Sequence, residues 1–410
     1  MNTKKEIRMR LMSGVLAAGL PLTMFANGFR LPDQDAAATA RGEAFVATAD
    51  NPSAIYYNPA GITQLSGNNI RAGLYGLSFT TTYDAPAGGS YDTEDNVNLV
   101  PQVFYTYTME ELPLAFGLGA YAPFGMKVDW PQDTGFRTIA LKSDLKYATV
   151  NPVVAWRILT NLSVAAGPTF NFSSLNLQKG ITPFPKNDSF DFDGDGVAYG
   201  FNAGVMWKPI EQISLGLTYR SATTVDYDGT TKTKFVVAPP GYPNYLKQNA
   251  SASVEFPQSM TVGLSYRPTP KWNLEFNADW TDWSSLQTVN VNQAVPVPGV
   301  KFDWQASWYY EFGVTRELGK GWRVSAGYIY NQNSMPSANY NPWVPDQARQ
   351  FVSVGVGYQG EHLSFDVAYQ YGFAATRTVS GSAPSAFGQT ADGKYDYFSN
   401  AVSVSAGWHF

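Results

Sequence analysis

The connections between the predicted strands of this chain alternate in length from one end of the sequence to the other. About fourteen segments alternate large apolar residues with small or polar residues, a period of two that indicates strands with one apolar face. Short connections, such as residues 109–112 and 208–211, interleave with long connections centred near Gly88, Pro240 and Asn339. A barrel that spans an outer membrane has short turns at one end and long loops at the other, whereas a soluble sandwich has no reason to sort its loops in this way. The sequence therefore predicts an all-β transmembrane barrel.

Charged and large apolar residues fall on opposite faces of these segments. In residues 272–280, for example, Trp272 lies on one face and Glu275 on the other, and the last ten residues alternate in the same way up to an aromatic C-terminus. Such strands predict an outer face against lipid and an inner face against an aqueous lumen. Pro257 interrupts the eighth segment, which we interpret as one strand; two strands would make the number odd. The predicted strands begin near Asn69, Asn96, Leu112, Leu145, Asn161, Val197, Gln212, Ser251, Lys271, Gln305, Gly321, Gln350, His362 and Ser399.

The amino terminus has the three-part plan of a secretory signal. Four basic residues between Lys4 and Arg10 precede an uncharged run from residue 11 to residue 25, and the small residue Ala26 is a suitable cleavage site. The run of about 15 residues is short for a spanning helix, which needs roughly 20. We therefore predict a signal peptide over residues 1–26 and an exported mature protein, which leaves the periplasm, secretion or an outer-membrane barrel.

Composition excludes several classes of protein. The chain has no cysteine, so neither a disulfide framework nor a thiolate metal site is available. Aromatic residues make up 15% of the chain while the mean hydropathy is −0.21, as expected of strands that are apolar on one face only. The formal net charge of −5 argues against a nucleic-acid partner, which would call for clustered lysines and arginines.

Catalytic and metal-binding residues are not predicted. The chain has two histidines. His362 lies by a predicted periplasmic turn and His409 is the penultimate residue, so neither lies near the external rim, where a catalytic partner would be expected. Residues 191–196 imitate the opening of a calcium loop, with Asp191, Asp193 and Asp195 at alternate positions. The twelfth position of such a loop is asparagine here, where a bidentate glutamate is required, so calcium binding remains open and we predict no metal and no cofactor.

Several motifs resemble the FadL/TodX (OMPP1) family of outer-membrane transporters for hydrophobic compounds. The most specific is Asn58-Pro-Ala-Gly-Ile62, because it stands just before the first predicted strand. The resemblance covers essentially the whole mature chain in order. The other matching segments are Asn27-Gly-Phe-Arg-Leu31, Ala38-Thr-Ala-Arg-Gly42, Tyr121-Ala-Pro-Phe-Gly125, Asp282-Trp-Ser284 and Pro345-Asp-Gln-Ala-Arg349.

The resemblance implies a 14-stranded antiparallel barrel over residues 69–410, plugged by a small N-terminal hatch over residues 27–68, in the bacterial outer membrane. It also implies passive uptake of long-chain fatty acids, with capture in a groove between external loops, transfer to a hatch-lined pocket and lateral exit at a kink in the third strand. Monoaromatic hydrocarbons taken up by the same route are the alternative ligand. A general hydrophilic porin is the third hypothesis, and it predicts an open lumen. We expect a monomer surrounded by outer-membrane lipid.

Particular residues suit each of these roles. For the hatch pocket we predict Phe29, with packing against the barrel wall as the alternative; for the hatch motif, Asn58, Pro59 and Ala60. The groove residues would be Phe184, Phe190, Phe235, Val237 and Tyr242, with packing of the loops on one another as the alternative. The kink would lie at Gly117, Gly119 and Pro123, which weaken a strand, unless the small residues serve to make room for the hatch.

Charged residues on the lumen face are expected to form salt bridges between hatch and wall, because buried charges need partners. One of the arginines could instead meet the carboxylate of a fatty acid. These residues are Arg220, Glu275, Asp279, Glu311, Arg323 and Asp366.

Overall fold

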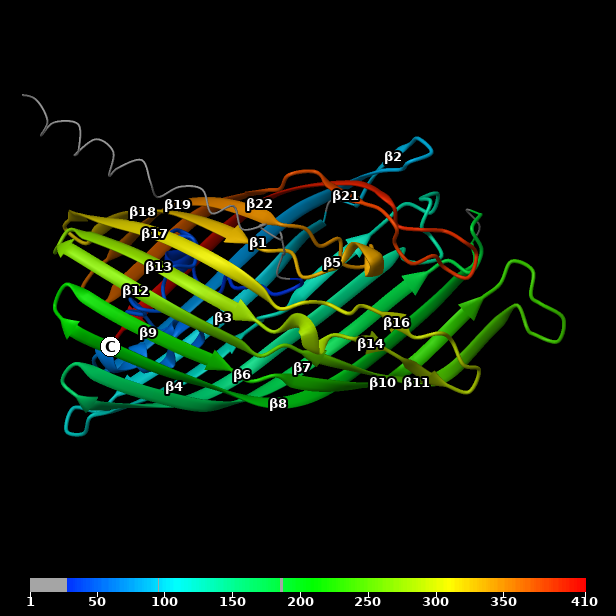
Figure 1. The fold of residues 1–410 in the computed structure, drawn as a ribbon. Coiled ribbons are helices and arrows are strands. Elements are labelled where there is room, and N and C mark those ends of the chain that lie inside the picture. The colour runs from blue at the N-terminus through cyan, green and yellow to red at the C-terminus, as the bar shows by residue number, and fades with distance from the viewer. Residues whose placement is uncertain (1–27, 95, 185–186) are drawn as a thin grey trace, which may run out of the picture.

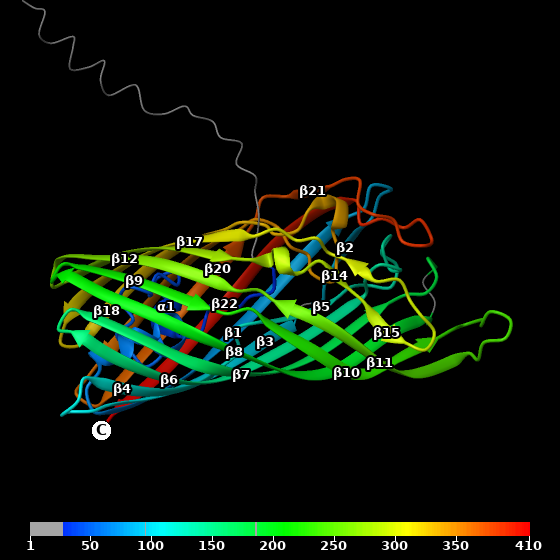
Figure 2. The same cartoon turned by 60° about the horizontal axis from the view of Figure 1, so that its bottom comes forward.

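The alternating segments form one closed antiparallel barrel of 14 strands (Figures 1 and 2). The computed structural model describes residues 28–94, 96–184 and 187–410, so the predicted signal peptide and Asn27 lie outside the described residues. The barrel closes where β1 (Asn68–Asp84) pairs with β22 (Gly393–His409), in register from Asn69 opposite His409 to Asp84 opposite Lys394. The predicted fold is therefore confirmed.

Three of the 14 strands are each built from two pieces that follow one another in the wall. The third strand is β4 (Leu114–Tyr121) with β5 (Gly125–Asp129), the seventh is β9 (Ile213–Arg220) with β10 (Thr223–Lys234), and the eighth is β11 (Tyr245–Phe256) with β12 (Ser259–Thr269). The uninterrupted strands besides β1 and β22 are β3 (Asn96–Thr108), β6 (Lys142–Leu159), β7 (Leu162–Lys179), β8 (Ser189–Ile210), β13 (Trp272–Thr281), β17 (Ser307–Gly319), β18 (Trp322–Asn331), β19 (Arg349–Gln359) and β20 (Leu363–Phe373).

The eighth strand is one strand with a break at Pro257, as predicted. Its piece β11 pairs with β10, and its piece β12 pairs with β9, so both pieces follow the same neighbour. Proline has no amide hydrogen to donate, which accounts for the interruption of the ladder.

Several strands begin earlier than predicted. The sixth strand begins at Ser189 instead of near Val197, and the eighth begins at Tyr245 instead of near Ser251. Pairing continues on the external side of the membrane, where residues such as Asp191 and Asp193 on β8 make the sequence resemble a polar loop. The external loops are correspondingly shorter than predicted.

Short elements lie between the barrel strands on the external side. They are β2 (Ser90–Asp92), the 3₁₀ helix η2 (Trp283–Ser285), β14 (Thr288–Val289), β15 (Val291–Gln293), β16 (Val300–Lys301), the 3₁₀ helix η3 (Ser337–Asn339) and β21 (Arg377–Val379). The loops around η2 and η3 add aromatic side chains to the largest buried apolar cluster, including Trp283, Trp304 and Trp343.

Residues 28–67 fold inside the barrel, where they are the blue segment of Figures 1 and 2. This segment, which we call the hatch, contains α1 (Ala36–Thr39), α2 (Ala54–Tyr57) and the 3₁₀ helix η1 (Pro59–Gln64). All four residues of α1 and of α2 are buried, because the wall surrounds them. Among the described residues, no helix has the length and apolar character that crossing a membrane requires.

Candidate functional site

The motif that begins at Asn58 anchors the hatch to the wall. Asn58 caps η1, since its side-chain oxygen accepts from the amide of Ala60, and its Nδ2 donates to the carbonyl of Val46 at 2.9 Å and to that of Val205 on β8 at 3.0 Å. Pro59 packs beside Gly204, where an added Cβ would lie 2.9 Å from the proline ring. An asparagine at this position therefore ties together two hatch segments and one wall strand.

Buried ion pairs hold the hatch at a second place. Arg71 on β1 is 2% exposed and pairs with Asp35, the N-cap of α1, and with Asp366 on β20 at 2.7 Å. Arg323 on β18 also pairs with Asp366 at 2.7 Å. The pair between Arg71 and Asp35 joins wall and hatch, whereas Arg323 and Asp366, for which a pair with the hatch was expected, pair with residues of the wall. Together these pairs balance the buried charges.

Asp279, Arg220 and Glu275 also contact the hatch directly, and Glu311 is linked to it through Asn277. Arg30 of the hatch pairs with Asp279 at 2.6 Å, and Arg220 donates to the carbonyl of Tyr56 at 2.9 Å with its guanidinium 4.4 Å from that ring centroid. Glu275 accepts from the amide of Ala47 at 2.7 Å. Glu311 accepts from Asn277, whose amide also donates to the hatch carbonyl of Glu43.

Two carboxyl groups are buried within the hatch itself. Burial raises the pKa of Asp33 to about 6, and burial together with the neighbouring Asp33 raises the pKa of Glu43 well above its ordinary value. The hydroxyl of Tyr57 donates to Glu43 Oε2 at 2.6 Å. Both carboxyl groups therefore keep their protons to higher pH than exposed carboxyl groups do.

The third strand is broken between Tyr121 and Gly125, and the hatch satisfies the backbone at the break. The side chain of Gln34 both donates to the carbonyl of Ala122 at 2.9 Å and accepts from its amide at 3.2 Å. The amide of Leu31 donates to the carbonyl of Pro123 at 2.8 Å, and that of Gly125 donates to Phe29. A hatch segment thus takes the place of a missing strand partner, which buried backbone groups require.

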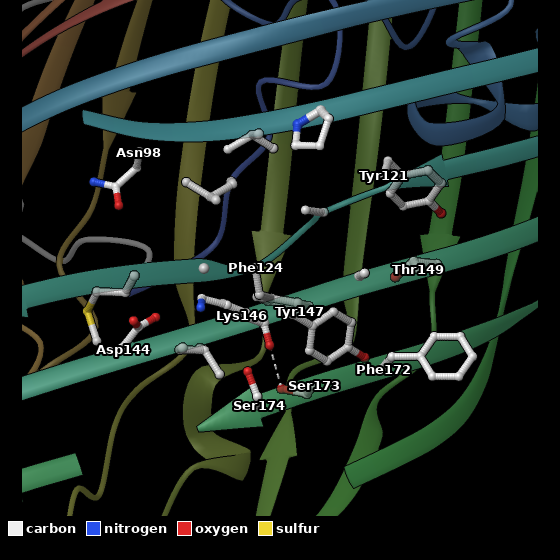
Figure 3. A pocket seen from close by; sticks show the side chains of 18 of the residues that line it. Asn98, Tyr121, Phe124, Asp144, Lys146, Tyr147, Thr149, Phe172, Ser173 and Ser174 are labelled. Carbon is white, nitrogen blue, oxygen red and sulfur yellow. Dashed lines mark hydrogen bonds between the residues drawn. The ribbon is translucent and has the colours of Figure 1, made fainter. Parts of the chain in front are cut away.

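The break leaves an opening between β3 and the third strand. Within the described residues, β4 pairs with residues 103–108 of β3, whereas residues 96–102 of β3 pair only with β1. A cavity of about 1310 Å³ lies there, with Phe124 and Tyr147 at its centre in Figure 3. Its lining includes the buried Phe124 and also the exposed Leu99 and Phe172 on the outer face. The cavity therefore connects the interior of the barrel with its lipid-facing surface.

Of the three residues predicted for the kink, only Pro123 lies at the break. Gly117 and Gly119 lie within β4 and pair regularly with β3 and β6. An added Cβ at Gly117 would come within 2.8 Å of Ile55 of the hatch, and one at Gly119 within 2.9 Å. Gly117 and Gly119 therefore do not form the kink, and their assignment to it is corrected. The contacts agree with the alternative, in which these small residues make room for the hatch.

Replacing Gly119 with valine should loosen the hatch and leave the pairing of β4 intact. The added atoms would overlap Ile55 and Phe104, and such overpacking costs about 1–3 kcal/mol. Guanidinium unfolding followed by circular dichroism measures this cost. Gly76→Val is the matched control, because its Cβ would meet Leu99 at an ordinary 3.4 Å. Equal stability of the two variants would contradict the role of Gly119.

An apolar cavity of about 80 Å³ lies inside the barrel, on the external side of the hatch. Phe29 lines it and is 8% exposed, with its ring 4.7 Å from that of Trp283 and 5.8 Å from those of Phe256 and Trp304. Lys179 at the end of β7 is the only charged residue among the described residues that line this cavity, and its Nζ lies 5.7 Å from the Phe190 ring centroid.

The five predicted groove residues do not gather at this cavity. Phe190 lines it from β8 and is 9% exposed. Phe184 is 63% exposed and Val237 83% exposed, and Tyr242, like Phe235, lies in the connection between β10 and β11. That hairpin extends from the external end of the barrel (Figure 1). Val237 and Tyr242 are exposed on it, whereas Phe235 is half-buried.

The aspartates that resemble a calcium loop lie in a regular strand. Asp191, Asp193 and Asp195 occupy alternate positions of β8, so they share one face in a row instead of converging on one point. Among the described residues, no group of three potential ligands is placed to hold a metal ion. His362 lies at the periplasmic end, where its Nδ1 is 2.9 Å from the carbonyl oxygen of His409.

Sequence reasoning missed several residues around Phe29 and the opening. Trp283 and Phe124 lie in motifs that carried the family resemblance, which was the available signal for them. Trp304 and Lys179 lie in segments without a motif, and only the closed barrel brings Trp304 against Phe29 and Lys179 to the apolar cavity. Gln34, whose side chain pairs with the broken strand, gave no sequence signal.

Comparison with known proteins agrees with this geometry. The family described as outer membrane protein transport protein (OMPP1/FadL/TodX) matches residues 17–410. A long-chain fatty acid transport protein of Escherichia coli O6:H1 is 22% identical over 402 residues, covering 87% of this chain and 89% of the relative.

Solved structures share the fold. A FadL homologue from Pseudomonas aeruginosa superposes with a TM-score of 0.81 at 21% identity, covering 93% of this chain and 99% of that one. The toluene transporter TodX of Pseudomonas putida gives a TM-score of 0.71 at 16% identity, covering 95% of this chain and 100% of that one. The chain is therefore a β-barrel of the bacterial outer membrane and belongs to the OMPP1/FadL/TodX family of transporters for hydrophobic compounds.

Proposed function

We propose that this protein takes up long-chain fatty acids and releases them sideways into the outer membrane through the opening beside the third strand. The observation that carries the proposal is the continuity of the two cavities. Met126 and Leu145 line both the apolar cavity and the opening, and Phe29 of the first packs against Phe124 of the second, with ring centroids 6.1 Å apart. A ligand that displaces Phe29 therefore has an apolar route to the lipid.

Lateral release also suits the energetics of such a ligand. Each methylene group that returns to water costs roughly 0.8 kcal/mol, so a route that ends in lipid keeps the favourable transfer energy. Because Gln34, Leu31 and Phe29 hold the backbone at the break, movement of this hatch segment would change the inner edge of the opening. Ligand entry beside Phe29 and release at Pro123 would in this way be coupled.

Capture begins, in this proposal, at apolar residues exposed on the external loops. Phe184, Val236, Val237 and Tyr242 are between 47% and 83% exposed, and exposed apolar patches of this kind commonly mark binding surfaces. In this proposal the protein acts as a monomer surrounded by lipid, since β1 pairs with β22 and the barrel closes within one chain.

Lys179 favours a fatty acid over a neutral hydrocarbon. The cavity that it borders is otherwise apolar, so an acid could place its tail beside Phe29 and its carboxylate at the rim. A toluene-like ligand could pack against the aromatic lining, but it has no charged group that could pair with the ammonium group of Lys179.

Replacing Lys179 with methionine should weaken the binding of a fluorescent fatty acid by roughly 10- to 100-fold, because a hydrogen bond to a charged group contributes about 1.5–3 kcal/mol. The affinity for the corresponding fatty alcohol should stay within about twofold. Equilibrium binding to the protein in detergent measures both. Lys234→Met, at the exposed end of β10, is the control. Equal losses for acid and alcohol would reduce Lys179 to a packing role, and strong binding of toluene alone would favour the aromatic ligand.

A further inference from the structure

A second chamber lies between the hatch and the wall at the periplasmic end of the barrel. Its volume is about 320 Å³, and it is separate from the cavities of the proposed route, with which it shares no lining residue. The hatch contributes Arg41 and Asp50, the end of β12 contributes Arg267, and β17 and β18 contribute Glu317 and Arg323. The lining thus holds three guanidinium groups and two carboxylates.

Arg41 stands out among these groups because it is buried and two of its three nitrogen atoms have no acceptor among the described residues. Its side chain lies in the hatch turn after α1 and is 5% exposed, yet its Nε and Nη2 donate to no acceptor in the described residues. The nearest aromatic ring, that of Phe45, is 5.7 Å from its Cζ. Burial lowers the pKa of Arg41, as expected for a cation that has lost water and gained no ion pair. A buried charge in this condition is costly unless something pairs with it.

The neighbouring charges do not supply that partner. The charge of Glu275 favours the charged form of Arg41, but the Glu275 carboxylate accepts hydrogen bonds from the amides of Ala47 and Thr48. Asp50 lies 3.5 Å from Arg267 in a pair of which both side chains are more than 40% exposed. Arg323 directs its Nη2 to both oxygens of Asp366.

We propose that this chamber binds a small oxyanion, of the phosphate or carboxylate class, that enters from the periplasmic side. A guanidinium presents its donors in a planar fork that matches the two oxygens of a carboxylate or phosphate. Arg41 lines the chamber from the hatch, and Arg267 adds positive charge from the periplasmic end of β12. The site does not depend on the uptake route, and the two can be tested separately.

Equilibrium dialysis of the full-length protein in detergent tests the proposal, with radiolabelled inorganic phosphate and acetate as probes at constant ionic strength. We expect saturable binding of at least one probe at concentrations up to about 10 mM. Arg41→Gln should weaken it at least about tenfold, since the other two arginines of the lining, Arg267 and Arg323, are already paired with Asp50 and Asp366. Arg316→Gln is the matched control, because Arg316 stacks on Trp272 at 5.0 Å and does not line the chamber.

Thermal unfolding separates an anion site from a structural arginine. If the chamber takes an anion, phosphate should raise the unfolding temperature of the parent protein and not that of Arg41→Gln, because a ligand stabilises only the state that binds it. Destabilisation of Arg41→Gln by the same amount at every phosphate concentration would overturn the proposal.

A further variant decides the matter if Arg41→Gln fails to fold. Arg267→Gln changes a side chain that is 41% exposed, so folding should survive, and binding should fall about threefold through the loss of a nearby charge. Absence of saturable binding by the parent protein, or equal binding by the parent and both variants, would overturn the proposal. A preference for phosphate or for acetate would identify which oxyanion class the chamber takes.

Discussion

Replacing Arg71 with methionine should free the hatch while the barrel stays folded. Among the described residues of the wall, only Arg71 pairs with Asp35, the N-cap of α1. Both side chains are about 2% exposed or less. Removing one member of a buried ion pair leaves the other charge uncompensated, at a cost of about 3–5 kcal/mol. Asp366 would suffer less, because it keeps its pair with Arg323. The cost therefore falls on the docking of the hatch.

Single-channel conductance in planar bilayers measures this release. The parent protein should be nearly silent, because the hatch fills the lumen, and Arg71→Met should show frequent openings. Arg316→Met is the control, because its guanidinium lies over Trp272 away from the hatch. Retention of the folded, heat-modifiable mobility of the barrel in electrophoresis shows that the wall is intact. A folded but silent Arg71→Met would mean that Asn58 and the other contacts suffice, and large steady openings of the parent would favour a porin.

The barrel was predictable because its strands repeat one simple requirement. Each strand must be apolar on the side that faces lipid. The alternation around residues such as Trp272 and Val404 therefore shows which side of the strand faces outward. The charges of the lumen were predictable for a similar reason, since a buried aspartate such as Asp279 needs a cation, here Arg30. In both cases the chemical character of a residue is enough to predict the kind of environment or partner that it needs.

The details of the site were not predictable in this way. Gly117 and Gly119 suggested a weakened strand, but they lie in a regular one. Glycine is needed there because a side chain would collide with Ile55, which lies about 60 residues earlier in the chain. Phe190 looked like a loop residue, because nothing local shows that the β7–β8 ladder continues beyond the membrane. Lys179 comes to the rim of the apolar cavity only after that ladder forms. These contacts form only when the barrel closes, and they produce no repeating pattern in the sequence from which they could be predicted.

The strongest test of lateral release is to fill the opening from its own edge. Ala122 lines the opening at the break in the third strand, and it packs against the small buried cluster of Tyr75, Val100 and Ala401. A tryptophan there would place an indole, which buries about 150–250 Å², in the space between β3 and the third strand. If ligands leave by this route, uptake of a radiolabelled long-chain fatty acid by a deletion strain carrying Ala122→Trp should fall to the level of the strain without the protein.

Binding should survive this change, because Phe29 and Lys179 border a different cavity. Equilibrium binding of a fluorescent fatty acid should therefore stay within about threefold of the parent value, which separates a blocked exit from a lost pocket. Ala326→Trp provides the matched control, since Ala326 lies on β18 between two fully paired neighbours, opposite Val314 and Val354. A lipid-facing tryptophan is well tolerated in such a wall. Normal uptake by a folded Ala122→Trp protein would exclude release beside the third strand and direct attention to a path through the hatch, where Arg71→Met should then increase transport.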